Sequence, residues 1–106
     1  MAWIYLFIAG LLEVVWAFSM KQSEGFSRLG PSVVTLVAML GSFWLLAAAM
    51  RTIPLGSAYT IWTGIGAVGA FLVGITLLNE PVNAMRIAAA TLIVSGLVLM
   101  KLSTPW

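Results

Sequence analysis

Four long runs of apolar residues occupy most of this 106-residue chain. Each run has close to the ~20 residues that a helix needs to cross a hydrocarbon layer about 30 Å thick. The runs cover residues 2–20, 32–50, 57–78 and 84–100. They lack the apolar–polar alternation of a membrane barrel, so the expected spanning elements are helices. The sequence therefore predicts an all-α integral membrane protein, with four transmembrane helices per subunit in a single domain of residues 1–106.

The composition excludes several other classes of protein. Hydrophobic residues make up 62% of the chain and charged residues 8%, which is too little polar surface to cover a soluble core. There is no Cys, His or Asp, so a metal site would have to be built from three glutamates. A nucleophile–base pair and a phosphate-binding loop are also missing. We expect a lipid bilayer as the surroundings, and no enzyme activity, no cofactor, no metal and no nucleic-acid partner.

Glu13 is a charged residue near the middle of an apolar run, whereas Arg86 lies near the start of the fourth run, at the expected level of the headgroups. An ionisable side chain near mid-membrane is energetically costly and is a functional-site hypothesis by default. Burial disfavours the charged carboxylate, so the group should bind either a proton or another cation. Competition between the two at one site, opened to each side in turn, is the physical basis of exchange. The alternative is a structural role, in which protonated Glu13 bonds to a neighbouring helix.

Aromatic residues near Glu13 and in the third run indicate which cation is bound. Trp16 shares the helix face of Glu13, and Tyr59 and Trp62 are likewise three residues apart. Aromatic faces attract weakly hydrated organic cations, whereas Na⁺ or Ca²⁺ would require more oxygen ligands. We expect Glu13 to bind proton and substrate in a pocket with Trp16, Tyr59, Trp62 and Ser42, whose hydroxyl can donate to the carboxylate. Ordinary packing is the alternative for each aromatic residue.

Small residues recur in the third and fourth runs. The third run contains Gly64, Gly66 and Gly69. These glycines permit either a bend in mid-span or the close approach of another helix. The fourth run contains Thr91, Ser95 and Gly96. This pattern suits a close helix–helix contact, which we assign to dimerisation.

The basic residues are almost evenly divided between the two ends of the predicted spans. One end carries Arg51 and Lys101, and the other carries Lys21, Arg28 and Arg86. Orientation in the membrane depends on the difference in the number of basic residues between the two ends. Here the difference is 3 − 2 = 1, which is too small to favour one orientation strongly. We therefore expect insertion in both orientations, with an antiparallel, dual-topology homodimer as the working unit. A single orientation set by one residue of bias is the alternative.

Four segments of the chain resemble the small multidrug resistance family, and within it the guanidinium-exporter subtype. They are "AGLLEVVWA", "GFSRLGPSVVT", "PLGSAYTIWTGIGAVGA" and "LIVSGLVLMKLS". The resemblance implies an antiparallel dimer in the bacterial inner membrane that exports guanidinium, and small substituted guanidines, by proton-coupled alternating access. Ser57 and Thr60 depart from the usual pattern, which reads Thr and Ala there.

The resemblance also implies roles for individual residues. Glu13 matches the carboxylate shared by proton and substrate, and the pocket positions match Trp16, Ser42, Tyr59 and Trp62. The bend of the third helix matches Gly64, Gly66 and Gly69, and the dimer contact matches Thr91, Ser95 and Gly96. Two alternatives stay open: efflux of quaternary ammonium compounds as a multidrug transporter, and a structural membrane subunit without transport.

Overall fold

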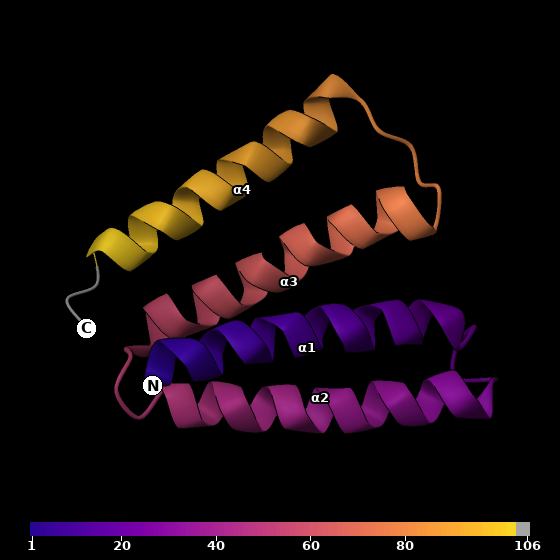
Figure 1. The fold of residues 1–106 in the computed structure, drawn as a ribbon, viewed down its shortest axis with the longest axis horizontal. Helices are drawn as coiled ribbons and strands as arrows, with labels where there is room; N and C mark the ends of the chain where they lie inside the picture. Colours follow the sequence, from indigo (N-terminus) through magenta and orange to yellow (C-terminus); the bar gives the residue numbers. More distant parts are fainter. Residues whose placement is uncertain (104–106) are drawn as a thin grey trace.

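The computed structural model describes residues 1–103, which form four helices (Figure 1). They are α1 (Ala2–Gln22), α2 (Leu29–Ala49), α3 (Leu55–Leu77) and α4 (Ala84–Ser103). All four are long and apolar enough to cross a membrane, which confirms the all-helical prediction with four spans. Residues 104–106 of the predicted domain lie outside the described residues.

Two prolines explain why α2 and α3 begin two or three residues before the predicted spans. Pro31 lies in the first turn of α2, and Pro54 is the N-cap of α3. The first N–H groups of a helix have no partner within that helix, so a residue that lacks an N–H is tolerated there. Helix α2 therefore begins two residues before Pro31, and α3 begins directly after Pro54.

The loop between α1 and α2 is organised by Ser23, which is fully buried. Its hydroxyl donates to the carbonyl of Met20 (2.7 Å) and accepts from the N–H of Phe26 (3.0 Å). The backbone turns through residues 24–26, all of which have positive φ. This short turn brings α2 back beside α1 in the antiparallel sense (Figure 1).

The connection between α3 and α4 is also held by specific hydrogen bonds. Asn79 adopts a left-handed backbone conformation (φ 56°), and the N–H of Glu80 donates to the carbonyl of Gly74 (3.0 Å). Asn83 accepts from the N–H of Arg86 (2.9 Å), which satisfies one of the free donors at the start of α4. The sequence predicts this cap, since Asn directly precedes the fourth apolar run.

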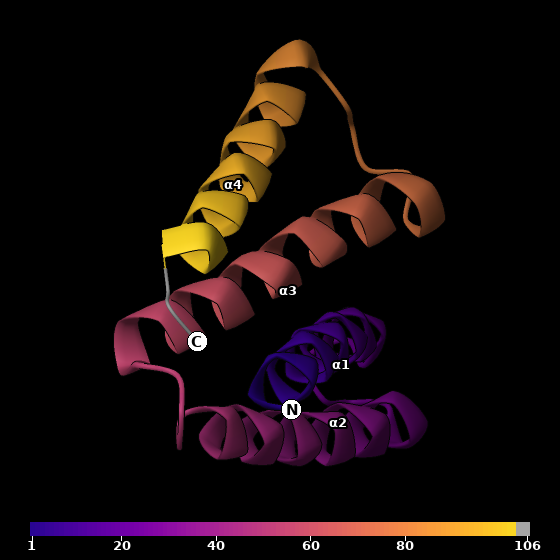
Figure 2. The same ribbon diagram turned by 60° about the vertical axis from the view of Figure 1, so that its left-hand side comes forward.

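Helix α1 lies between α2 and α3 and supplies the centre of the packing (Figure 2). The core is made of buried residues from these three helices and from the turn after α2: Leu6, Ala9, Leu46, Ala49, Ile53, Ala58, Ile61 and Trp62. A Cβ at Gly10 would overlap Ile65 of α3. The absence of a side chain at Gly10 therefore permits the close packing of α1 and α3.

Helix α4 stands apart from the other three. Its backbone approaches α3 alone, and no residue in it is buried. The two helices form a V that widens toward the loop joining them (Figures 1 and 2). Near the closed end, the Lys101 ammonium lies over the ring of Trp3 in α1, 4.3 Å from its centroid. Most of the apolar surface of α4 is consequently free to contact lipid or another chain.

Candidate functional site

A hydrogen-bond network joins the three packed helices at Ser42. The Ser42 hydroxyl donates to the carbonyl of Ala9 in α1 (2.7 Å). The indole Nε1 of Trp62 in α3 donates to the same hydroxyl (2.9 Å). Ser42 is fully buried and Trp62 is 7% exposed, so these bonds form away from water. The structure thus brings together two of the predicted pocket residues, with the backbone of α1 as their third partner.

Aromatic rings pack against Trp62 on both sides of this network. On one side, Tyr59 packs against Trp62 with ring centroids 5.5 Å apart. On the other, Phe43 packs edge-on against Trp62 at 5.8 Å and against Trp16 at 6.4 Å. All three separations fall within the range of about 4.5–7 Å that favours aromatic pairs. The three predicted aromatic residues are therefore joined, through Phe43, in one continuous row of packed rings, which we call the aromatic surface.

Among these packed aromatic rings, Phe43 is the one that the sequence did not predict. It lies in α2 directly after Ser42 and connects Trp16 of α1 to Trp62 of α3. No spacing rule within one helix identifies such a residue, because its role depends on how α2 is rotated against both neighbours. Its position next to Ser42 is the one signal that the sequence offers.

Glu13 lies in the middle of α1 and is half-buried. Its Oε1 atom is buried and accepts no hydrogen bond within residues 1–103. A Cβ at Gly66 of α3 would overlap the Glu13 carboxyl group. Gly66 therefore leaves the space in which this carboxyl group lies. A buried acceptor without a donor is energetically costly, and binding of a proton or a cation would remove that cost.

The indole of Trp16 is the second unsatisfied group near the site. Its Nε1 is buried and has no acceptor in the described part of the chain. Trp16 follows Glu13 by three residues on the same helix, so the two side chains project from one face of α1. One free acceptor and one free donor are thus available on that face.

Ser42 has a different hydrogen-bond partner in this structure from the one expected from the sequence, and its place in the substrate pocket remains a prediction. Its single hydroxyl proton is donated to Ala9 rather than to the Glu13 carboxylate. The Ser42 hydroxyl lies within reach of the Ala9 carbonyl, whose second lone pair can accept a bond beside the one from the N–H of residue 13 within α1. Ser42 consequently orients Trp62 and anchors α2 to α1, and the Glu13 oxygen stays unpaired.

The glycines of α3 contact two different helices. Gly69 makes room for Val14 of α1, as Gly66 does for Glu13. On the other side, a Cβ at Gly64 would overlap Leu97 of α4. Close helix approach is thus observed for all three glycines. The predicted bend remains a prediction, since α3 is one continuous helix from Leu55 to Leu77.

The small residues of α4 remain exposed. Thr91 donates its hydroxyl to the carbonyl of Ile87 (2.8 Å), within its own helix. Gly96 has no atom within 4 Å of the position that a Cβ would take, and it borders a cavity of about 490 Å³ between α3 and α4. The dimer contact of Thr91, Ser95 and Gly96 therefore remains a prediction.

The fold and the site together define a class: a small multi-pass membrane protein with a half-buried carboxyl group in mid-span, on the same helix face as one of a row of packed aromatic rings. No cluster of three metal-binding side chains occurs in residues 1–103. A family model described as Small Multidrug Resistance protein matches residues 1–93. The chain belongs to the small multidrug resistance family, and its four apolar spans make it a multi-pass protein of the inner membrane.

Characterised relatives are similar along nearly the whole chain. The guanidinium exporter of Escherichia coli K12 is 60% identical over 104 residues, which cover 98% of this chain and 99% of that protein. The guanidinium exporter of Yersinia pseudotuberculosis is 56% identical over 98% of this chain and 100% of its own. The guanidinium exporter of Citrobacter freundii is 55% identical over 98% of this chain and 99% of its own. These relatives are transport proteins, not enzymes.

The Ser42 network generates a stability prediction. Ser42→Ala removes the acceptor of the Trp62 indole, which leaves a buried N–H unpaired, and it removes the second donor to the Ala9 carbonyl. We expect a loss of about 1–3 kcal/mol in the free energy of unfolding, measured by thermal or denaturant unfolding in detergent. The Ser42→Ala, Trp62→Phe double variant has no indole N–H to leave unpaired. Its loss of stability should therefore be smaller than the sum of the losses in the two single variants. Fully additive losses would show that the two side chains are not coupled.

Proposed function

We propose that this protein exports guanidinium ion in exchange for protons, by alternating access. The observation that carries the proposal is the half-buried Glu13 carboxyl group in the middle of α1, whose Oε1 atom is buried and unpaired. Identity of 55–60% to guanidinium exporters over nearly the full length supports the choice of substrate. Small substituted guanidines share the relevant chemistry and belong to the same substrate class.

The guanidinium ion suits the residues of this site. It is planar, weakly hydrated and rich in N–H donors, so it can form two parallel hydrogen bonds to one carboxylate. Its flat face can also stack on an aromatic ring. Glu13 would supply the carboxylate, and the surface formed by Trp16, Tyr59 and Trp62 would supply the aromatic faces. Ser42 would hold Trp62 in orientation.

Proton coupling follows if one carboxylate serves both ions. A neutral Glu13 cannot attract guanidinium electrostatically, and an ionised Glu13 occupied by guanidinium cannot take up a proton. Binding of one ion therefore requires release of the other. If the site opens to one side at a time, outward movement of guanidinium is obligatorily linked to inward movement of protons.

The working unit in this proposal is an antiparallel homodimer. Helix α4 supports it, because no residue of α4 is buried in the single chain and its small residues Thr91, Ser95 and Gly96 suit close helix contact. The nearly equal division of basic residues supports insertion in both orientations. Gly64, Gly66 and Gly69 would let α3 bend as the site changes its side of access.

Export of quaternary ammonium compounds is the second candidate function. One observation favours it: Tyr59, 53% exposed, borders the α3–α4 cavity as well as the aromatic surface. Most of that cavity is lined by apolar groups, with the hydroxyls of Thr60 and Thr63 as exceptions. Alkyl substituents of a larger cation could occupy it while the charged centre stays near the rings.

The central role of Glu13 predicts the effect of one substitution. In proteoliposomes, a guanidinium gradient should drive an electrical or pH signal through the wild-type protein. Glu13→Gln should reduce this signal to that of protein-free liposomes, because the amide keeps the shape of the side chain but cannot exchange protons. Glu24→Gln is the matched control, since it removes an exposed carboxylate in the α1–α2 loop and should retain transport.

The same assay separates the two candidate substrates. A signal with guanidinium and little response to tetraalkylammonium ions supports the guanidinium exporter. A strong response to bulky ammonium ions that exceeds the guanidinium signal would assign the protein to drug efflux. Guanidinium-driven proton movement that persists in Glu13→Gln would contradict the assignment of Glu13.

Competition at one carboxylate predicts a specific pH dependence. Below the pKa of the carboxyl group, guanidinium must displace a bound proton. Apparent guanidinium affinity should therefore rise with pH, by up to about tenfold per unit while the protonated form predominates, and then level off. Tryptophan fluorescence titrations at a series of pH values measure this dependence. A flat profile in the wild-type protein would exclude direct competition.

The charge distribution predicts dual topology. Reporter proteins fused to the C-terminus, one active on each side of the membrane, should both show activity in cells. Adding one Lys or Arg to the end that carries Lys21, Arg28 and Arg86 should shift the ratio strongly toward one orientation, since it doubles the present bias of 3 − 2 = 1 residue. Adding one to the other end should remove the bias. Activity of one reporter alone in the unmodified protein would contradict dual insertion.

A further inference from the structure

A second cavity lies at the end of the molecule opposite the tightly packed core. It has a volume of about 310 Å³, at the lower end of the range of about 300–1,000 Å³ typical of ligand sites. Its walls come from the C-terminal halves of α1 and α3 and from the start of α4. The apolar lining is Val14, Ala17, Phe18, Ala67, Ala70, Phe71, Val73, Gly74 and Leu78. The proposed transport site does not use this cavity.

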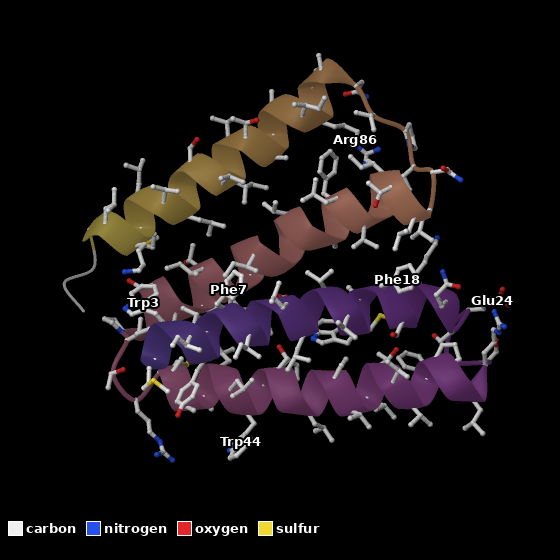
Figure 3. All side chains as sticks on the ribbon, in the orientation of Figure 1. Trp3, Phe7, Phe18, Glu24, Trp44 and Arg86 are labelled. Carbon is white, nitrogen blue, oxygen red and sulfur yellow. The ribbon has the colours of Figure 1, made fainter. Side chains whose placement is uncertain are left out.

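Two basic side chains line the same cavity. Lys21 is in the last turn of α1, and Arg86 is in the first turn of α4. The Arg86 guanidinium lies over the ring of Phe71, 5.8 Å from its centroid. Figure 3 shows Arg86 between the start of α4 and the end of α3, and Phe18 on the side of α1 that faces α3. Both bases therefore lie where membrane spans meet the lipid headgroups.

One acidic residue, Glu80, also borders the cavity. Its carboxylate is folded against α3, where a Cβ at Gly74 would overlap Oε1. Within residues 1–103, no ion pair joins it to Lys21 or Arg86. The charges around the cavity therefore sum to 2 − 1 = +1, which favours an anion and disfavours a second guanidinium site.

An apolar extension runs from this cavity along the groove between α3 and α4. A smaller cavity of about 160 Å³ shares Ala67, Phe71 and Arg86 with the first. Its remaining lining, Val68, Ala89, Ala90 and Ile93, is entirely apolar. A ligand that fills both spaces must therefore carry an anionic group at one end and a hydrocarbon chain at the other.

We propose that this groove binds an anionic phospholipid, with the phosphate between Lys21 and Arg86 and an acyl chain along α3 and α4. Free phosphate has no group for the apolar part of the groove. A zwitterionic lipid places a cationic amine close to two bases, so a lipid with net negative charge is preferred. In an antiparallel dimer, the two copies of the site would face opposite leaflets.

Native mass spectrometry of the purified protein tests the proposal. The probes are phosphatidylglycerol and phosphatidylcholine with the same acyl chains, and inorganic phosphate alone. We expect preferential retention of phosphatidylglycerol. Lys21→Gln and Arg86→Gln should each weaken it about fivefold, the effect of losing one cation near a lipid surface. Lys21→Arg keeps the positive charge, so this variant should retain phosphatidylglycerol as the wild-type protein does.

Arg28→Gln is the matched control. Arg28 is exposed on the same side of the membrane as Lys21 and is not part of the cavity. Its removal changes the topogenic charge bias by the same amount as Lys21→Gln, and it should leave lipid retention unchanged. Equal losses in all three Gln variants would overturn the proposal in favour of diffuse surface charge.

Three other results would also overturn it. Equal retention of the two lipids would show that the charge is not recognised. Thermal stabilisation by inorganic phosphate that matches that by phosphatidylglycerol, and is lost in Lys21→Gln, would identify free phosphate as the ligand. Unchanged lipid retention in Lys21→Gln and Arg86→Gln, together with a lower dimer fraction, would show that a second copy of the chain covers the groove.

Discussion

A carboxyl group in the middle of an apolar helix needs space that no side chain of the neighbouring helix fills. Gly66 provides this space, because a Cβ there would overlap the Glu13 carboxyl group. The rest of the packing follows from the same requirement. Gly10 and Gly69 keep α1 and α3 close on either side of Glu13 along the helix pair. The result is a buried oxygen without a protein donor, held at a fixed place by the packing around it.

The polar network at Ser42 complements this arrangement. Three helices are joined by two hydrogen bonds, from Ser42 to Ala9 and from Trp62 to Ser42, and all hydrogen-bonding capacity in that network stays within the scaffold. Glu13 and Trp16 keep theirs unused. The site thus separates groups that position the aromatic surface from groups that remain free for a ligand. A ligand with several N–H donors and a flat face would pair with the Glu13 oxygen and stack on the aromatic rings, and guanidinium has this combination. It brings no acceptor for the Trp16 indole N–H.

The sequence predicts the fold well because membrane spans depend on length and hydrophobicity, which are local properties. The caps at Pro54 and Asn83 are local too. The depth of Glu13 and the helix face that it shares with Trp16 also follow from spacing along one helix. The contacts of Ser42 and Phe43 do not, because they depend on the rotation of α2 against its neighbours. Nor does spacing reveal that Gly66 faces Glu13 while Gly64 faces α4, since both fit a bend equally well.

The placement of the five basic residues is subject to two demands at once. Dual insertion requires that the two ends carry nearly equal numbers, whereas an anionic lipid site requires two bases at one particular place. Lys21 and Arg86 meet the second demand, and they are two of the three bases at the end that is richer by one. A further base there would strengthen lipid binding but would also bias insertion toward one orientation. The carboxylate of Glu80 does not relieve this conflict, because acidic residues contribute little to topology. Under the two proposals, Arg51 and Lys101 at the opposite end would balance the charge of Lys21 and Arg86, so that lipid binding by these two residues would not fix the orientation of the chain.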